Sequence, residues 1–317
     1  MYTRIGTDGP VTSRIGLGVA TLMREGRSSR RLSVIEEALE SGVRHFDVAP
    51  LYGLGAAEKE LGRALEQCGH DTTVATKYGL QPSRAAQMLS AVQGPIRRML
   101  KASPGLRNLA RSYGGSSGVE PVPSIDDLNS SVLRSLDHLR RETVDLLLLH
   151  EIAWSHEWAE VWLRASTTDG RRYRELGIAS RRELLPSYPE YVVSGNHPIQ
   201  TESNPFETRE EYFRSIRYGL VSGHFNMLNS FLAEDAPSKA SLERLTGAPL
   251  RSAADLVVFL CGLQLARSSD SIVLIGSTKP KNIQSVWNGV AAHGPSIAAS
   301  ITQVDALLKP LRAAITP

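Results

Sequence analysis

An aspartate, a tyrosine, a lysine and a histidine stand at or just after the ends of three apolar segments. Asp47 ends the segment VRHFD, and Tyr52 follows it by five residues. Lys77 ends TVATK, and His150 ends DLLLLH. If these segments are parallel strands of one barrel, their carboxyl ends share one mouth, and the four side chains come together there. The sequence therefore predicts a group that combines a phenol, a cation, an anion and an imidazole.

Such a group suits the transfer of a proton to an oxygen that gains charge. A tyrosine with a pKa of ~10 is a poor acid near neutral pH, and the ammonium of Lys77 would favour the phenolate of Tyr52. Lowering the Tyr52 pKa by ~2 units needs about 2.7 kcal/mol of differential interaction. A buried lysine tends to lose its proton, so we expect Asp47 to pair with it. The imidazole of His150 can orient a carbonyl oxygen. This chemistry is that of an aldehyde or ketone accepting a hydride.

Alternating strands and helices must position these residues. We expect an antiparallel hairpin from residues 2–5 and 11–13. The expected strands span residues 15–19, 43–47, 73–77, 144–149, 176–179, 199–202, 219–222 and 271–275. The expected helices span residues 29–41, 55–67, 124–139, 208–216, 252–266, 280–288 and 301–314, with a less regular helical piece from 156 and a loop near 192–193. About eight strand–helix units predict an α/β fold, a closed (β/α)8 TIM barrel with the hairpin before it and a helix after it.

Bulk composition limits the class of protein. The 317 residues are 41% hydrophobic and 22% charged, which is ordinary for a globular chain. A net charge of +3 is too small to indicate binding to nucleic acid or to a membrane surface. Cys68 and Cys261 have no metal-like spacing, so we expect no metal site and two reduced thiols in a cytoplasmic protein. We expect one domain over 1–317, with an insertion at about 78–123 that contains a helix at 95–102.

The blocks around these residues resemble the aldo-keto reductase family. The block FDVAPLYGLGAAEKELGRAL is similar to that family's second strand, catalytic loop and following helix. TVATKYG, VDLLLLHE, ELGIAS, IQTESNPF and IVLIGSTKPKNI match later blocks in the correct order. The overall look is nearest to the bacterial aldose and sugar dehydrogenase-like members. The resemblance implies an NAD(P)-dependent oxidoreductase acting on CH-OH groups, with Tyr52 as general acid/base in a tetrad with Asp47, Lys77 and His150.

The resemblance also implies a cofactor extended across the barrel mouth, without a Rossmann domain. Ser180 and Gln200 match positions that hold the nicotinamide carboxamide, and Phe225 falls where a tyrosine usually stacks on the ring. The residues that match the adenosine phosphate end are Gly276, Ser277, Thr278, Lys279 and Asn282. The insertion and the segment from Glu151 through Trp154 to His156 are expected to wall the substrate pocket. Trp154, soon after the histidine, is the expected apolar wall.

Three departures from the family pattern bear on the cofactor. Arg181 replaces a frequent asparagine, Asn282 replaces an arginine, and VSGHFNML replaces a tyrosine–serine–proline segment. Lys279 and Lys281 could still pair with a 2′-phosphate, which favours NADP(H) and leaves NAD(H) open.

Two other classes of function remain open at this point. A cofactor-binding regulatory subunit of the same fold would bind the cofactor with little turnover. A metal-dependent barrel hydrolase needs several histidines or carboxylates at strand ends, where His150 stands nearly alone. The expected partner is a small carbonyl or alcohol, either sugar-like or specific to a biosynthetic reductase. The sequence gives no oligomeric state.

Overall fold

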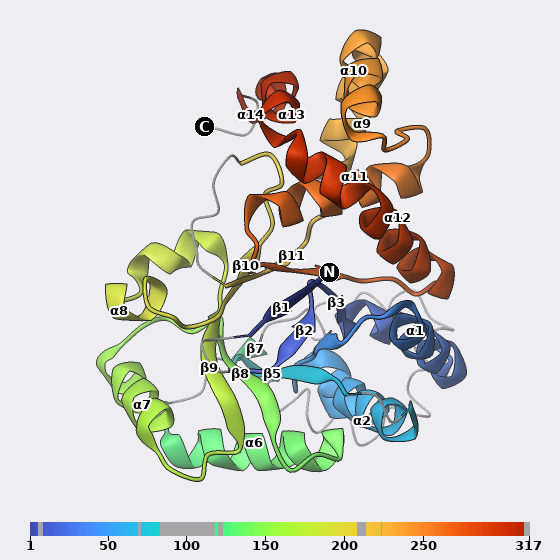
Figure 1. The fold of residues 1–317 in the computed structure, drawn as a ribbon. Coiled ribbons are helices and arrows are strands. Elements are labelled where there is room, and N and C mark those ends of the chain that lie inside the picture. The colour runs from blue at the N-terminus through green and yellow to red at the C-terminus, as the bar shows by residue number, and fades with distance from the viewer. Residues whose placement is uncertain are drawn as a thin grey trace, which may run out of the picture.

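Eight parallel strands close into a barrel in the order β10-β11-β12-β3-β4-β5-β8-β9 (Figure 1). The computed structural model describes residues 1–5, 9–68, 71–82, 118–119, 123–207, 214–222 and 224–313. The barrel strands are β3 (Ile15–Gly18), β4 (His45–Asp47), β5 (Thr73–Gly79), β8 (Val144–His150), β9 (Tyr173–Ala179), β10 (Ile199–Glu202), β11 (Ser215–Tyr218) and β12 (Ile272–Ile275). The predicted (β/α)8 fold is therefore confirmed.

Helices surround this barrel (Figure 1). They are α1 (Ser28–Ser41), α2 (Ala56–Cys68), α6 (Ile125–Leu139), α7 (His156–Thr167), α8 (Glu190–Val193), α9 (His224–Glu234), α10 (Ala236–Thr246), α11 (Ala253–Arg267), α12 (Pro280–Ala299), α13 (Ile301–Leu307) and α14 (Lys309–Ala313). Short 3-10 helices span Val19–Arg24, Tyr52–Gly55 and Arg182–Ser187. Local signals fix several ends. Ser124 caps α6 by accepting a hydrogen bond from the Asp127 N–H, and Gly42 ends α1 in the left-handed region with φ 107°.

The predicted N-terminal hairpin covers the amino end of the barrel. Its strands β1 (Tyr2–Arg4) and β2 (Val11–Ser13) pair antiparallel. The Ser13 hydroxyl accepts hydrogen bonds from the N–H groups of Arg44 and His45, at 2.7 and 3.2 Å, where β4 begins. Ile5, just after the hairpin's first strand, is buried against barrel-interior residues such as Leu146. The hairpin thus closes the end opposite to the strand ends that carry chemistry.

A second antiparallel pair lies at the base of the predicted insertion. Strands β6 (Gln81–Pro82) and β7 (Gly118–Val119) pair with each other. Strand β5 runs on through Gly79, so the barrel strand is longer than the sequence indicates. The helix expected at 95–102 lies outside the described residues, and the single-domain reading stays a prediction.

The seventh barrel strand comes earlier in the chain than the sequence indicates. The helix expected over 208–216 is wrong at its end, because Ser215 and Ile216 belong to β11, and residues 208–213 lie outside the described part. The strand expected over 219–222 is also wrong, since this segment is a turn. The cause is Arg217, an arginine inside β11 that is only 3% exposed and donates to the Glu202 carbonyl oxygen at 3.1 Å.

Two helices between β11 and α11 have no counterpart in the sequence-based assignment. They are α9 and α10, and Figure 1 shows them standing with α13 and α14 in a helical layer beyond β10 and β11. Asp235 caps α10 by accepting from the Ser238 N–H at 2.9 Å. Three smaller corrections concern boundaries. α12 continues eleven residues beyond the expected 288, the terminal helix is split into α13 and α14, and residues 192–193 lie inside α8.

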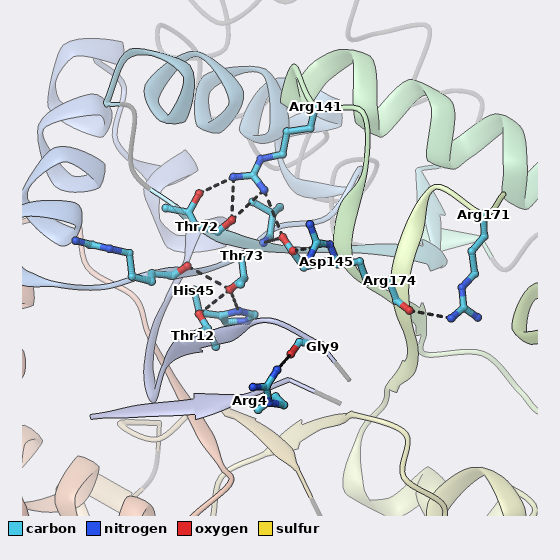
Figure 2. Close-up of polar contacts among 12 residues, drawn as sticks. Arg4, Gly9, Thr12, His45, Thr72, Thr73, Arg141, Asp145, Arg171 and Arg174 are labelled. Atoms are coloured by element: carbon cyan, nitrogen blue, oxygen red, sulfur yellow. Dashed lines mark hydrogen bonds and ion pairs between the residues drawn. The ribbon is translucent and has the colours of Figure 1, made fainter. Parts of the chain in front are cut away.

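Polar contacts lock the starts of β5 and β8 at the amino end of the barrel (Figure 2). The Asp145 carboxylate accepts from the Val74 N–H at 2.8 Å and from the Arg141 guanidinium at 3.3 Å. Arg141 also donates to the carbonyl and hydroxyl oxygens of Thr72, at 3.0 and 2.5 Å. Arg174 lies 3.5 Å from the other oxygen of Asp145. One nearly buried carboxylate therefore joins two neighbouring strands.

Removing this carboxylate tests the lock. We expect Asp145→Ala to lower the free energy of unfolding by about 2 kcal/mol, because the buried Val74 N–H loses its acceptor. Urea titration measures the change. The control is Asp169→Ala, which alters an exposed aspartate. Equal stability losses in the two variants would contradict this account.

Candidate active site

A buried ion pair lies at the carboxyl ends of β4 and β5. The Lys77 Nζ lies 2.5 Å from Asp47 Oδ2, and the two side chains are 2% and 5% exposed. Lys77 also donates to the Val48 carbonyl oxygen at 3.2 Å. The Gln200 amide donates to the same Asp47 oxygen at 2.9 Å, from β10 across the barrel. These contacts bring together three of the residues that the sequence singled out.

The ion pair decides the charge of the lysine. Burial lowers the pKa of Lys77, and the Asp47 carboxylate opposes this by Coulomb attraction and by its hydrogen bond. A buried ammonium without an anion would lose its proton. The expected pairing of Asp47 with Lys77 is confirmed, and it keeps a cation inside an apolar barrel.

Tyr52 lies on a tight turn directly above this pair. Its loop turns sharply because Gly53 and Leu54 take left-handed φ values of 59° and 57°. The Lys77 Nζ lies 5.7 Å from the centroid of the Tyr52 ring. The expected lowering of the Tyr52 pKa is wrong. Burial raises it first, and the carboxylates of Asp47 and Glu151 raise it further. The phenol is therefore protonated at neutral pH.

His150 at the end of β8 is a neutral imidazole at neutral pH. Burial lowers the pKa of His150 to about 3, and the Lys77 charge lowers it as well. A neutral imidazole can donate one hydrogen bond and accept another. It can therefore orient an oxygen without competing as a cation.

These residues line one cavity of about 260 Å³ at the barrel mouth. The predicted residues on its wall are Asp47, Tyr52, Lys77, His150, Gln200 and Gly276. The other lining residues are Gly18, Ala20, Thr21, Glu151, Ala179, Tyr218, Gly219, Leu274 and Ile275. The tetrad and Gln200, drawn from four strands and a loop, thus face one space.

A second cavity of about 420 Å³ continues from the first. The two share the lining residues Thr21, Gly219, Leu274, Ile275 and Gly276. At Gly276 a Cβ would meet the Thr21 hydroxyl oxygen at 2.6 Å, so a side chain there would crowd Thr21, which lines both cavities. The predicted residues Ser277 and Asn282 line the second cavity and are joined by a 3.1 Å hydrogen bond. Together the cavities form one long groove.

The start of α12 borders this groove. Lys279 is the N-terminal cap residue of α12 and is exposed, and Thr278 precedes it. Neither residue belongs to the described lining of the two cavities. The groove's polar side chains near this end are uncharged.

Three further predicted residues lie outside the described lining of both cavities. Ser180 is 1% exposed, and its oxygen accepts from the Tyr188 hydroxyl at 3.3 Å. Phe225 lies on α9 and packs against the core. Trp154 packs on Trp162 and Tyr188, with ring centroids 6.1 and 5.5 Å apart, so its role is in an aromatic cluster beside the site.

Sequence reasoning missed Tyr218 in the first cavity and expected Glu151 only as part of a segment that walls the pocket. Tyr218 ends β11. Burial raises the pKa of Tyr218, and the Glu202 carboxylate, which accepts a hydrogen bond from its hydroxyl, raises it further. Glu151 follows His150 directly. A correct seventh strand would have put Tyr218 at the barrel mouth.

His45 lies beneath the ion pair on the same strand. Its Nδ1 lies 3.0 Å from the Thr73 hydroxyl oxygen, and its Nε2 has no partner in the part of the chain that the structure describes. Burial lowers the pKa of His45 to about 4; Lys77 lowers it too, and Asp47 opposes the change. The barrel interior therefore holds this imidazole neutral.

The described residues contain no cluster of metal-ligating side chains large enough to hold a metal ion. Within the described helices, none is long and apolar enough to cross a membrane.

A closed barrel of eight parallel strands with this polar group at its mouth belongs to the class of TIM-barrel proteins. Part of its sequence is similar to one known family. Residues 14–167 match the profile described as "Aldo/keto reductase family". The chain is therefore similar to the aldo/keto reductase family over this segment.

Similar proteins agree with this placement. The uncharacterized oxidoreductase YqkF of Bacillus subtilis is 29% identical over 147 residues, 46% of this chain and 38% of that protein. The D-threo-aldose 1-dehydrogenase of Pseudomonas sp. is 29% identical over 150 residues, 42% of this chain and 37% of that protein. The chain thus matches less than two fifths of each relative's length. The holo form of the aldo-keto reductase AKR11C1 from Bacillus halodurans has a TM-score of 0.62 at 18% identity, covering 94% of this chain and 95% of that one.

The buried imidazole gives a test by pH. The unfolded chain binds this proton near pH 6.5 and the folded chain only near pH 4, so stability is present above pH 6.5 and falls as the pH drops towards 4. The loss at pH 4 is roughly 3 kcal/mol. We expect His45→Leu to remove this part of the pH dependence, measured by urea unfolding between pH 4 and 7.

The matched control is His156→Leu, at an exposed position on α7. We expect its stability to follow the wild-type pH curve. An unchanged slope in His45→Leu would contradict the burial of a neutral imidazole.

Proposed function

We propose that the protein is an NAD(P)-dependent oxidoreductase that interconverts an aldehyde or ketone and its alcohol. The observation that carries this proposal is the buried Lys77–Asp47 pair beneath a protonated Tyr52, with a neutral His150 on the same cavity. The similarity of residues 14–167 to the aldo/keto reductase family supports it.

In the proposed mechanism Tyr52 is the general acid/base. An alkoxide is more basic than a phenolate, so an oxygen that has received a hydride takes the proton of Tyr52 in spite of its raised pKa. The Lys77 ammonium then stabilises the phenolate that remains, and Asp47 holds that ammonium in place. In the oxidative direction the same phenolate accepts the proton of the alcohol. His150 orients the substrate oxygen.

The long groove fits a dinucleotide. Its two halves share five lining residues, among them Gly276, where a Cβ would crowd Thr21. A nicotinamide cofactor would supply the hydride, held by Gln200 at the inner end and by Gly276, Ser277 and Asn282 towards α12. Tyr218, which lines the inner cavity, suits the stacking role that the sequence gave to Phe225.

The choice between the two dinucleotides is part of this proposal. Lys279 and Lys281 are exposed at the start of α12, whose Asn282 and Ser285 line the groove. Their ammonium groups favour a 2′-phosphate, and hence NADP(H). The substrate would be a small polar carbonyl or alcohol. A cytoplasmic location stays a prediction from the cysteine content.

One observation favours a second candidate, a cofactor-binding regulatory subunit with little turnover. The Ser180 hydroxyl, expected to hold the carboxamide, is bonded to Tyr188. Arg181 beside it donates to Glu183 at 2.8 Å, and its Nε lies 3.7 Å from Glu151. These contacts alter the part of the site that orients a nicotinamide ring.

Replacing the phenol tests the leading proposal. We expect Tyr52→Phe to lower kcat by at least about 100-fold, because no other group on the cavity supplies the proton in the proposed mechanism. The cofactor Kd is expected to stay within about twofold. Steady-state kinetics and fluorescence titration measure the two quantities. The control is Tyr191→Phe, at an exposed tyrosine of α8.

Most of the activity surviving in Tyr52→Phe would refute the role of Tyr52. Absence of turnover in the wild type, with cofactor binding intact, would instead favour the regulatory subunit.

Titration with NADPH and NADH tests the cofactor. We expect NADPH to bind about tenfold more tightly, a difference of about 1.4 kcal/mol. The double variant Lys279→Gln/Lys281→Gln should remove this preference, whereas Lys309→Gln, at an exposed lysine of α14, should keep it. Protein fluorescence gives each Kd. Tighter binding of NADH by the wild type would overturn the assignment.

A further inference from the structure

Glu151 brings a carboxylate to the wall of the inner cavity, next to the tetrad. It follows His150 at the end of β8 and lines the cavity with Tyr52 and Lys77. Its φ of 48° is unusual for a residue with a side chain. The Glu151 N–H donates to the Ala179 carbonyl oxygen at 2.7 Å, which fixes the backbone in this conformation. The position of the side chain is therefore set by the barrel.

The oxygens of this carboxylate are available for a ligand. The nearest cation is Arg181, whose Nε lies 3.7 Å away, beyond hydrogen-bond distance. Arg181 itself donates to Glu183 at 2.8 Å. Among the described residues none donates a hydrogen bond to the Glu151 carboxylate. The side chain is 29% exposed, so water or a ligand reaches it.

The neighbouring carboxylate is different. Glu202 accepts from the Arg182 N–H at 2.7 Å, from the Thr201 hydroxyl at 3.2 Å and from Tyr218. Its hydrogen-bonding capacity is used within the protein. Glu151 is therefore the carboxylate of this region that can accept from a substrate.

The charges around the cavity restrict what can bind there. Lys77 is neutralised by Asp47, and Arg181 lies beside two carboxylates. Asp47 and Glu151 both act on Tyr52, where each raises the pKa of the phenol. A second anion near Tyr52 would be repelled by both, and their repulsion is strong in a partly buried site. A neutral group with hydroxyl donors meets no such penalty.

We propose that Glu151 is a specificity-determining residue, which accepts a hydrogen bond from a hydroxyl of a neutral, hydroxyl-bearing substrate and rejects substrates that carry a carboxylate. The proposal rests on the proposed function, because it takes the inner cavity as the substrate site. It assigns the substrate class to small neutral polyols and their carbonyl forms.

Equilibrium binding of two four-carbon alcohols tests this assignment. Erythritol is neutral and carries four hydroxyl groups, and 4-hydroxybutanoate carries a carboxylate. Neither reacts with a reduced cofactor, so calorimetry in excess NADPH measures binding without turnover. We expect wild-type protein to bind erythritol at least about tenfold more tightly than 4-hydroxybutanoate. Glu151→Gln should reduce this ratio by about tenfold, because it removes the charge and keeps the size.

The matched control is Glu183→Gln. Glu183 pairs with the same Arg181, is 69% exposed and is not among the lining residues of the cavity. We expect this variant to keep the wild-type ratio. Glu151→Asp, which keeps the charge, should keep the preference for the neutral ligand. Thermal unfolding of each variant checks that the fold is retained.

Three results would overturn the proposal: an unchanged ratio in Glu151→Gln, equal affinities in the wild type, or no binding of either ligand. Turnover separates it from the proposed function. With oxidised cofactor, Glu151→Gln should raise the KM for erythritol, whereas Glu183→Gln should leave it unchanged. Wild-type protein that binds erythritol selectively without turnover would refute the oxidoreductase and keep the specificity. Turnover of erythritol by the wild type, together with an unchanged affinity ratio in Glu151→Gln, would keep the oxidoreductase and refute the role of Glu151.

Discussion

The site depends on one buried ion pair, the contact between the Lys77 ammonium and the Asp47 carboxylate. Burying either charge without the other would cost several kcal/mol. The ammonium and the carboxylate therefore depend on each other. The ion pair links the end of β4 to β5, and the hydrogen bond from Gln200 links Asp47 to β10 on the far side of the barrel. The closed sheet supplies the rigidity that holds these groups at fixed separation. Both the charge available to Tyr52 and the shape of the cavity follow from this arrangement.

The barrel separates this reactive end from an end that holds the strands together. At the amino end, polar side chains meet partners of the protein itself, as Asp145 does with Arg141 and the Val74 N–H. The barrel interior between the ends holds apolar side chains and the neutral imidazole of His45. Charge therefore occurs where the loops can satisfy it or where a substrate can enter. The strand starts carry stability, and the strand ends carry chemistry.

Much of the site could be predicted from the sequence, because the carboxyl ends of all strands in a parallel barrel meet at one mouth. A side chain at the end of an apolar strand therefore lies at that mouth. Asp47, Lys77 and His150 follow from this rule. The rule fails where the sequence pattern does not reveal the strand. Arg217 inside β11 breaks the apolar pattern, and the buried arginine is satisfied by tertiary contacts that no local pattern reveals. The error in that strand left Tyr218, which ends β11 and lines the first cavity, out of the expected site.

The direction of the Tyr52 pKa could not be obtained from residue types either. A lysine near a phenol lowers its pKa, but Lys77 faces Asp47, and burial with two carboxylates outweighs the cation. The second carboxylate, Glu151, is held at the site by a strained backbone and by hydrogen bonding to β9. Such strain persists where the surroundings over-determine it, and it accumulates at functional positions. The Glu151 carboxylate opposes ionisation of the Tyr52 phenol, and the proposed binding of a neutral hydroxyl group would offset this cost.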